Sequence, residues 1–242
     1  MLVNADIKSL EVCTCGYLSN DEVLKQEVRD KTDFHANNQK RFNLPDRVTA
    51  KRFVFKLIYG ATAWGYANDS DFISVGFNDH EWQEVIDEFY AKYVGIAKWH
   101  KDIVQQAITT GCYVLPTGRT YTYPSTDVVS RMWYWKPKIL NYPVQGLGAD
   151  LVMVARISAH KRIRKSGIRA IPVMTVHDSI VYDVLDTSEE AWYNIGRILK
   201  EAVNDVPTNF KRLFEVEFDL PLDAEIQVGK TLGEKQVVNY NQ

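Results

Sequence analysis

The best-marked pattern of hydrophobic and polar positions runs from residue 47 to residue 61. Apolar residues recur there at the spacing of one helix face, at Ala50, Val54, Leu57, Ile58 and Ala61. The other face carries a stripe in which every fourth residue is cationic or aromatic: Arg47, Lys51, Phe55 and Tyr59. A step of four residues drifts only about 40° around a helix, so this stripe spans about 18 Å. The pattern predicts a helix with one buried face and one face free to contact a ligand.

Helical periodicity recurs along the chain. Asn78 and Glu81 can form a capping box ahead of an apolar stripe that reads Trp82, Val85, Ile86, Phe89, Tyr90 and Tyr93. Because apolar residues at this spacing usually face a core, we interpret the stripe as buried packing. Helices are also expected over residues 9–40 with a break at 18–21, over 96–110, over 143–165 and from Thr187 onward.

Extended segments are expected near both ends of the chain. Residues 2–6 form a short run that leads into a helix, and residues 170–176 and 180–184 are β-patterned runs around a polar turn. Residues 113–119 predict a strand and a turn. The alternation in residues 218–229 predicts an edge strand that closes a sheet. Neither a repeat nor a Pro/Ser-rich linker interrupts the sequence, so we expect one continuous module.

Composition limits the class of protein. With 242 residues, 45% hydrophobic and 25% charged, the chain can bury a substantial core and has the residue usage of a globular protein. It contains no run near the roughly 18 apolar residues that a membrane span needs, and its charged N-terminus is unlike a signal peptide. We therefore expect no membrane contact and a cytoplasmic location. Cys13, Cys15 and Cys112 lack zinc-site spacing and are interpreted as reduced structural residues.

Charge changes the picture of what the chain binds. The net charge is −2, whereas a protein that grips duplex DNA alone usually has a basic excess, since phosphate neutralisation supplies much of the affinity. Basic residues gather locally instead, around residues 51–56 and 156–169. For the second group, a solvated helix end is an equally good interpretation. The charge balance therefore argues against a free-standing DNA clamp.

The stripe of residues 47–59 has the form Arg-x3-Lys-x3-Phe-x3-Tyr-Gly, which resembles the fingers-helix motif of family A DNA polymerases. On periodicity alone, a solvated surface with two partly buried rings would explain it equally well. Two further segments match the family in order. Asp6 and Glu11, spaced as Asp-x4-Glu, are similar to the first palm motif, and residues 176–179, Val-His-Asp-Ser, resemble the hairpin motif His-Asp-Glu. Ser179 departs from that motif, which usually has Glu there.

A fourth segment, residues 141–146 with the sequence Asn-Tyr-Pro-Val-Gln-Gly, resembles the part of the family that touches the minor groove of the primer-template duplex. The resemblance covers residue 2 to about residue 233. It implies an α+β fold with a right-hand palm, made of an antiparallel sheet with a catalytic hairpin, and helical fingers, the thumb being absent. The palm is expected at residues 1–22 and 112–242 and the fingers at residues 23–111.

The resemblance implies template-directed DNA synthesis by two-metal nucleotidyl transfer from a dNTP to a primer 3′-hydroxyl. Asp6 and Asp178 would be the catalytic metal ligands, with the backbone carbonyl of Ile7 as a third ligand and two Mg²⁺ ions as the cofactor. Although the two aspartates are far apart in sequence, each follows a strand, so a sheet can bring them together. A single Asp at a strand end is more often a turn former, and the ordered set of motifs is what favours catalysis.

The stripe would form the nucleotide site, again by resemblance. Arg47 would hold the outer phosphates, and Lys51 would contact the α-phosphate and act as general acid to the leaving group. Phe55 would pack on the deoxyribose and Tyr59 would lie beside the nascent base pair. Glu11 would hydrogen-bond Tyr59 and exclude a ribose 2′-hydroxyl.

Further site residues come from the same resemblance. His35, in an Asp-x-His element, would approach the incoming phosphates, although a lone histidine is more often structural. The residues expected to bind the primer-template are Asn141, Gln145, His177, Arg119, Lys136 and Lys138. The two lysines flank Pro137, which stands where the family usually has arginine, and an ammonium cannot copy a bidentate guanidinium.

The position of Asp6 near the N-terminus implies a partner. In the family, the thumb, part of the palm and often a 3′-5′ exonuclease domain precede the first palm motif. We therefore expect an N-terminal polymerase subunit that carries the thumb and covers unpaired edge groups of the first strand, either because the gene is split or because the chain is truncated.

Two alternatives remain. A single-subunit RNA polymerase shares the Arg/Lys/Tyr-Gly pattern and typically has His-Asp-Ser in the hairpin, but usually has Met in place of Phe55 and no carboxylate in place of Glu11. A non-catalytic nucleic-acid-binding subunit of a replication complex could keep the fold without the chemistry. Both aspartates and Lys51 are retained, which favours an enzyme.

Overall fold

The computed structural model describes residues 1–186 and 188–240 and divides into two compact units. Unit 1 comprises Met1–Glu11 and Gly146–Gln242, and unit 2 comprises Val12–Gln145. This division does not coincide with the expected palm and fingers, because residues 12–22 and 112–145 pack within unit 2. The palm and fingers boundaries stay a prediction. Within the described residues, no helix combines the length and apolar character that crossing a membrane requires.

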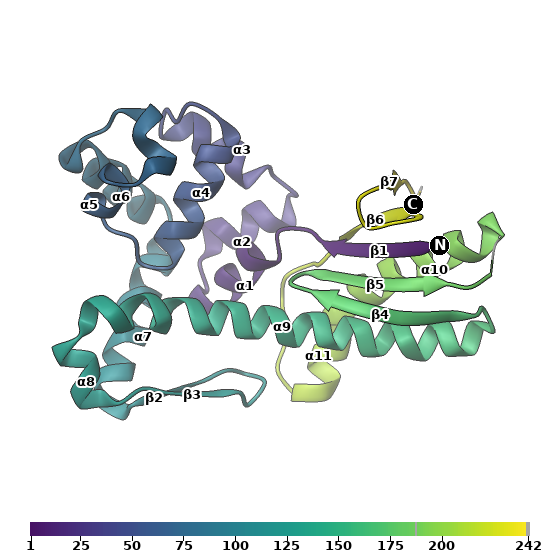
Figure 1. Cartoon of the computed structure of the whole chain (residues 1–242). Coiled ribbons are helices and arrows are strands. Elements are labelled where there is room, and N and C mark those ends of the chain that lie inside the picture. The colour runs from purple at the N-terminus through teal and green to yellow at the C-terminus, as the bar shows by residue number, and fades with distance from the viewer. Residues whose placement is uncertain (187, 241–242) are drawn as a thin grey trace. The chain divides into compact units, whose positions relative to one another are not determined.

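Unit 1 is built on an antiparallel sheet of order β4-β5-β1-β6-β7 (Figure 1). Its strands are β1 (Leu2–Ile7), β4 (Ala170–Val176), β5 (Ser179–Val184), β6 (Ala224–Gly229) and β7 (Lys235–Val238). The predicted first strand and the predicted hairpin are confirmed. The prediction that residues 218–229 form an edge strand is wrong, because β6 pairs with β1 on one side and β7 on the other.

The alternation of side chains in β1 fixes which face of the sheet is buried. Val3, Ala5 and Ile7 are fully buried, whereas Asp6 is half-buried on the other face. The helix α10 (Glu189–Asn204) packs on β1 and β6, and α11 (Val206–Phe214) follows it. Because β1 pairs on both sides, the expected unpaired edge of this strand is also wrong. The expected helix start at Thr187 lies outside the described residues, and the described N-cap of α10 is Ser188.

Unit 2 is mainly helical. Its elements in chain order are α1 (Leu10–Ser19, which begins in unit 1), α2 (Glu22–Arg29), α3 (Phe34–Arg41), α4 (Arg47–Ile58), α5 (Ala63–Ala67), the 3₁₀ helix η1 (Ser70–Val75), α6 (Asp79–Lys92), α7 (Val94–Thr110), the hairpin strands β2 (Cys112–Val114) and β3 (Thr120–Thr122), and α8 (Ser125–Ser130). The predicted capping box of Asn78 and Glu81 opens α6, and Gly111 ends α7 in a left-handed conformation. The buried Cys13 and Cys15 are free thiols.

An aromatic cluster forms the centre of unit 2. Phe53 of α4 stacks on Trp82 with ring centroids 5.6 Å apart, and Tyr66 stacks on the same indole at 4.9 Å. The Tyr66 hydroxyl donates to the Phe53 carbonyl at 2.7 Å. Phe53 is fully buried but was not among the predicted apolar positions of this helix. It lies three residues after Ala50, so the buried face of α4 is wider than the sequence pattern indicated.

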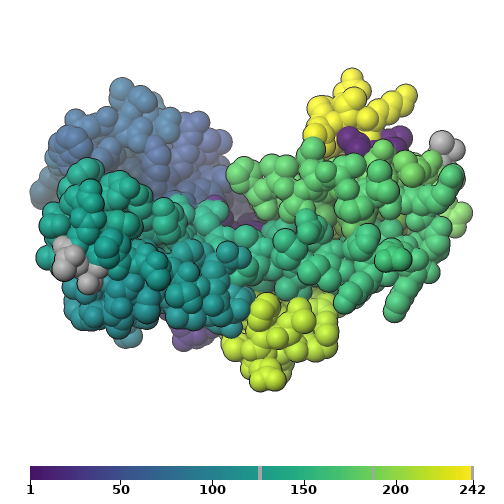
Figure 2. All heavy atoms as spheres, turned by 60° about the horizontal axis from the view of Figure 1, so that its bottom comes forward, coloured from purple at the N-terminus to yellow at the C-terminus, as the bar shows by residue number. Residues whose placement is uncertain are grey.

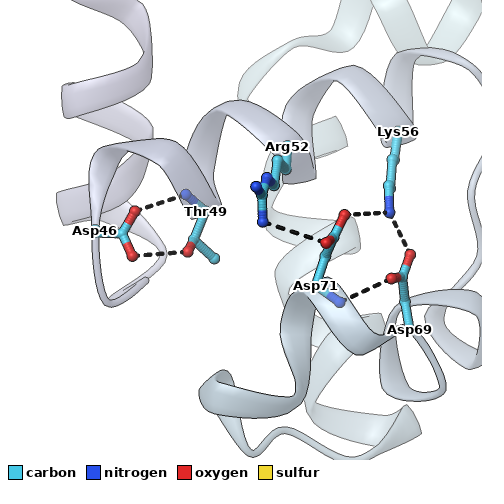
Figure 3. A network of polar contacts seen from close by, with 6 residues as sticks. All are labelled: Asp46, Thr49, Arg52, Lys56, Asp69 and Asp71. Carbon is cyan, nitrogen blue, oxygen red and sulfur yellow. Dashed lines mark hydrogen bonds and ion pairs between the residues drawn. The ribbon is translucent and has the colours of Figure 1, made fainter.

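Polar contacts fix both ends of α4 (Figure 3). Asp46 caps the N-terminus, where its carboxylate accepts from the Thr49 amide at 2.8 Å and the Thr49 hydroxyl at 2.9 Å. Further along, Arg52 donates to Asp71 at 3.3 Å, and Lys56 pairs with both Asp69 and Asp71 of the η1 segment. These contacts occupy one side of α4 and leave the Arg47–Tyr59 stripe on another.

The helix α9 (Met132–Ser166) is longer than predicted. Its expected end before Gly167 is confirmed, but the expected start at Pro143 is wrong, because Pro137 and Pro143 both lie inside the helix. A proline inside a helix loses one backbone hydrogen bond and costs about 3 kcal/mol. Burial of neighbouring side chains offsets that cost, since Ile139 and Leu140 are fully buried. Tertiary packing therefore overrides the local helix-breaking signal.

Candidate active site

The two predicted metal ligands, Asp6 and Asp178, come together at one end of the unit 1 sheet. Asp6 is the penultimate residue of β1, and Asp178 lies in the two-residue turn between β4 and β5. His177, the other turn residue, has φ of 52°, a left-handed conformation that closes this tight connection. The amide of Ile7 donates to the Asp178 carbonyl at 3.0 Å, so the end of β1 is tied directly to the turn.

The electrostatics of this end suit a cation. Burial raises the pKa of Asp178, and the negative charges of Asp6 and Glu11 raise it further, against a smaller opposing effect of His177. Carboxylates that raise one another's pKa gain stability when a positive charge is placed between them. The Ser179 hydroxyl donates to Asp6 Oδ2 at 3.0 Å, so it orients the carboxylate without adding a charge.

The donor set fits Mg²⁺ better than a softer metal. Asp6, Asp178 and the backbone carbonyl of Ile7 offer oxygen atoms only, and Mg²⁺ needs few protein ligands because it keeps several waters. Among the described residues, no group of three or more His, Cys, Asp or Glu side chains could hold a metal ion. Zinc and other metals that rely on several such side chains are therefore a poorer fit.

Sequence reasoning missed one carboxylate beside this pair. Glu225 is the β6 partner directly opposite Asp6, just as Ser179 is its partner in β5. Its carboxylate accepts from the Gln227 side chain at 2.8 Å. The alternation of β6 was visible in the sequence, but the register between β1 and β6 was not, and only that register places Glu225 opposite Asp6.

In unit 2, the stripe of α4 is joined by residues of α3. Arg47 donates to both carboxylate oxygens of Asp33, at 2.8 and 3.1 Å. Burial tends to raise the pKa of Asp33, but the hydrogen bonds from Arg47 and from the Ala36 amide outweigh it and lower the pKa. Arg47 is therefore paired in this structure, so a phosphate would have to compete with Asp33 for the guanidinium.

His35 lies beside this stripe, as the resemblance implied. Its ring is 5.4 Å from that of Phe55, and Lys51 Nζ lies 5.6 Å over the Phe55 ring. Burial lowers the pKa of His35 to about 4, with further lowering from Arg47 and Lys51. His35 is therefore neutral near pH 7, and the region it occupies carries a positive potential that favours an anion.

Tyr59 and Gln145 meet at the far end of the stripe. Gln145 Nε2 donates to the Tyr59 hydroxyl at 2.6 Å. The predicted hydrogen bond between Glu11 and Tyr59 joins residues of different units and stays a prediction. Asn141 and Gln145 are four residues apart in α9, so they share one face of that helix.

The remaining predicted nucleic-acid contacts occupy separate parts of unit 2. Arg119 follows Gly118 in the turn of the β2–β3 hairpin, where Gly118 has φ of 84° and the Arg119 carbonyl accepts from Leu115 at 2.8 Å. Lys138 Nζ lies 3.3 Å over the Tyr134 ring, and Lys136 lies beside Gly60. The Lys138 ammonium is held by aromatic rings, a setting in which its position is better defined than on a bare surface.

Comparison with known sequences places this geometry in context. The sequence profile described as DNA polymerase family A matches residues 1–234. DNA polymerase I of Pseudomonas aeruginosa is 29% identical over 219 residues, which are 85% of this chain and 23% of that protein. DNA polymerase I of Mycobacterium leprae is 24% identical over 96% of this chain, and the DNA polymerase of Bacillus phage SP01 is 23% identical over 78%. The chain spans about a quarter of the length of these relatives.

Among solved structures, the chain is similar to the POL domain of Pol1 from M. smegmatis, which was solved in complex with a DNA primer-template and a dNTP. The TM-score is 0.80 at 23% identity, and the match covers 95% of this chain and 39% of that one. At this level of identity the likeness establishes the fold, and it confirms the predicted α+β polymerase architecture.

Proposed function

The chain belongs to DNA polymerase family A, and on that premise we propose that it carries the palm and fingers catalytic part of a template-directed DNA polymerase. The observation that carries the proposal is the meeting of Asp6 and Asp178, which β1 and the β4–β5 hairpin bring to one end of the sheet. The raised pKa of Asp178 supports the same role, because this pair of carboxylates is stabilised by bound cations.

In the proposed reaction the primer 3′-hydroxyl oxygen bonds to the α-phosphorus of a dNTP, the bond to the β,γ-phosphates breaks, and pyrophosphate leaves. Asp6, Asp178 and the Ile7 carbonyl are the groups that would hold two Mg²⁺ ions, which supply charge neutralisation when bound. Ser179 holds the Asp6 carboxylate in one orientation through its 3.0 Å hydrogen bond. Lys51 donates a proton to the departing pyrophosphate oxygen.

Unit 2 contributes nucleotide binding in this proposal. Arg47 exchanges Asp33 for the outer phosphates, and neutral His35 donates a hydrogen bond to them without adding charge. Phe55 packs on the deoxyribose, beside Tyr59 at the nascent base pair. Glu11 of unit 1 excludes a 2′-hydroxyl.

The primer-template is held by groups that do not select sequence. Asn141 and Gln145 donate to minor-groove acceptors that all correct base pairs share. Three cationic side chains, Arg119, Lys136 and Lys138, contact phosphates, and His177 supports the primer terminus. The aromatic contacts of Lys138 favour a fixed cation at that point.

We further propose an N-terminal polymerase subunit as partner, supplying the thumb and, where present, a 3′-5′ exonuclease. Support comes from the relatives, of which this chain spans about a quarter, and from a net charge of −2, which is low for a protein that holds duplex DNA alone. The complex would act in the cytoplasm, that of a bacterial host if the gene belongs to a phage.

Primer extension by the Asp178→Asn variant tests the proposal. Loss of a metal ligand should reduce extension more than about 100-fold, the upper range for residues that merely support a ligand. Asp102→Asn removes a carboxylate of an exposed pair on α7 and should retain full activity. Both variants should keep the far-UV circular dichroism spectrum and melting temperature of the unmodified protein. Normal extension by Asp178→Asn would refute the two-metal assignment.

RNA synthesis is a second candidate, favoured by one residue. Ser179 completes a His-Asp-Ser hairpin and hydrogen-bonds Asp6, as a hydroxyl rather than a third carboxylate. Extension with rNTPs and dNTPs in parallel distinguishes the two. A preference for rNTPs by the unmodified protein would replace the DNA polymerase proposal.

A further inference from the structure

A groove without an assigned role lies in unit 1 between α9 and the edge strand β4. It has a volume of about 410 Å³ and is lined on the α9 side by Arg156, Ile157 and His160 and on the sheet side by Val173 and Tyr182. We call this the α9–β4 groove. Figure 2 shows unit 1 from the side on which α9 (green) faces the reader, above α11 (yellow-green).

The floor of the groove contains polar groups that lack partners. Tyr182 is 0% exposed, and its hydroxyl makes no hydrogen bond to any described residue. The same holds for Nδ1 of His160. A buried hydroxyl without a partner costs about 1–3 kcal/mol, so both groups gain from a ligand that accepts or donates there.

The charges around these groups favour an acceptor with a negative charge. Arg156 contacts the Thr175 hydroxyl at 3.5 Å and has no ion pair within the described parts of the chain. Its charge acts on Tyr182, whose pKa burial raises and Arg156 lowers. Lys161 also lines the groove, and no acidic side chain does. A carboxylate placed here would accept hydrogen bonds from Arg156 and Tyr182 together.

The rim of the groove is apolar and exposed. Ile157, Val173 and Met174 line it with exposed fractions of 47%, 44% and 40%. On the other side of α9, Ile157 and Lys161 also line a second hollow of about 240 Å³, which reaches Leu213 of α11. The outer side of α9 therefore forms a ridge between two hollows. Such a surface is apolar at its centre and basic at its rim, as protein interfaces commonly are.

We propose that the α9–β4 groove is the docking site of a second polypeptide, which packs apolar residues on Ile157 and Val173 and inserts a carboxylate between Arg156 and Tyr182. The occupant is the subunit suggested above to supply the thumb, so this inference rests on the proposed function. A nucleic acid fits less well, because nucleic-acid interfaces are more polar and more uniformly basic than this one. Charge complementarity with Arg156 and Lys161 requires that the inserted segment be acidic.

Complex retention is the first test. An affinity-tagged chain is expressed in its native source, and the isolated complexes are quantified by mass spectrometry for a polypeptide with the sequence of a family A thumb. Ile157→Glu and Arg156→Glu should each retain at least tenfold less of it. Ile73→Glu changes an equally exposed isoleucine of unit 2 and should retain as much as the unmodified chain. Full retention by both groove variants, or no such polypeptide with the unmodified chain, overturns the proposal.

Tyr182→Phe separates docking from folding. Removal of a buried hydroxyl without a partner should leave the melting temperature of the isolated chain unchanged or higher. The same variant should retain severalfold less partner, because the inserted carboxylate loses a donor. A lower melting temperature together with unchanged retention would show that the hydroxyl serves the fold alone, which contradicts the proposal.

Two further measurements exclude other occupants. If Arg156→Glu weakens binding of a fluorescein-labelled primer-template to the isolated chain and leaves partner retention unchanged, the groove binds nucleic acid. If light scattering shows a dimer that Ile157→Glu converts to a monomer, the occupant is a second copy. Either result overturns the proposal. Primer extension by the isolated complex is measured separately, so an inactive complex with an intact interface would count against the proposed function alone.

Discussion

The hydroxyl of Ser179 occupies the position next to Asp6 that the family pattern gives to a carboxylate. It donates to Asp6 Oδ2 at 3.0 Å, and the charge of the site is therefore set by Asp6 and Asp178 with Glu11 and Glu225 nearby. A hydrogen bond to a charged group contributes about 1.5–3 kcal/mol. The serine thus acts as a positioning residue for a ligand in our proposal.

We expect Ser179→Ala to weaken metal binding. The Asp6 carboxylate would lose its orientation, so the Mg²⁺ concentration that half-saturates extension should rise about 10- to 100-fold. Direct binding of Mn²⁺, followed by electron paramagnetic resonance, should weaken in parallel. Ser179→Thr keeps the hydroxyl and is the matched control. Equal metal affinity in the alanine and threonine variants would remove Ser179 from the site.

His35 gives a pH-dependent contribution to stability. Its pKa in the folded chain is about 4, below the ordinary value of 6.5, so the unfolded chain binds the proton first as pH falls. The stabilisation is complete above about pH 6.5 and is lost as pH falls from there to about 4. His35→Gln should therefore lose less free energy of unfolding between pH 7 and pH 4.5, by up to about 2 kcal/mol.

Urea denaturation at both pH values measures this difference. His80→Gln changes an exposed histidine on α6 and should follow the pH dependence of the unmodified chain. If His35→Gln follows it as well, the burial of His35 has no energetic consequence.

Among the elements, α4 shows how one helix joins a core to a binding face. Phe53 packs among Trp82, Tyr66 and Phe89, while Lys51 and Phe55 remain on the accessible stripe. We expect Phe53→Ala to destabilise the chain by about 3–5 kcal/mol, the usual cost of removing a buried aromatic side chain. Val48→Ala, at an exposed position of the same helix, should cost less than about 0.5 kcal/mol. Urea titration of both variants decides whether the buried face carries the stability.

The helix α4 also shows the limits of prediction from sequence. Its period located the stripe and most of the buried face, because both depend on local spacing. The aromatic partners of Phe53 come from α5 and α6, and no periodicity encodes them. The start of α9 was missed for the opposite reason, since the prolines gave a strong local signal that burial of Ile139 and Leu140 overrides.

For the site, sequence motifs located the aspartate pair because strand ends in one sheet can meet. They could not locate Glu225, whose position opposite Asp6 depends on strand register, nor the pairing of Arg47 with Asp33, which depends on how α3 packs on α4. The unpartnered hydroxyl of Tyr182 was equally invisible, because an alternating strand pattern gives the face of a side chain but not its hydrogen bonds.

At the level of the whole molecule, the charge balance limits what the isolated chain can do. With a net charge of −2, it should bind a primer-template weakly, and the partner should raise the affinity at least tenfold. Fluorescence anisotropy with a labelled primer-template at 50 and 200 mM salt measures both states. A single chain that binds tightly at the higher salt and extends primers processively would refute the need for a partner.

The strand order of unit 1 has a consequence for how the protein is made. β1 is synthesised first, yet its two neighbours, β5 and β6, begin at residues 179 and 224. At about 5–20 residues per second, the ribosome needs roughly 10–45 s to deliver β6 after β1. Unit 2 is continuous in sequence and can fold during that interval. The first strand must therefore stay unpaired through most of translation, which makes the nascent N-terminus the segment most exposed to chaperones and to aggregation.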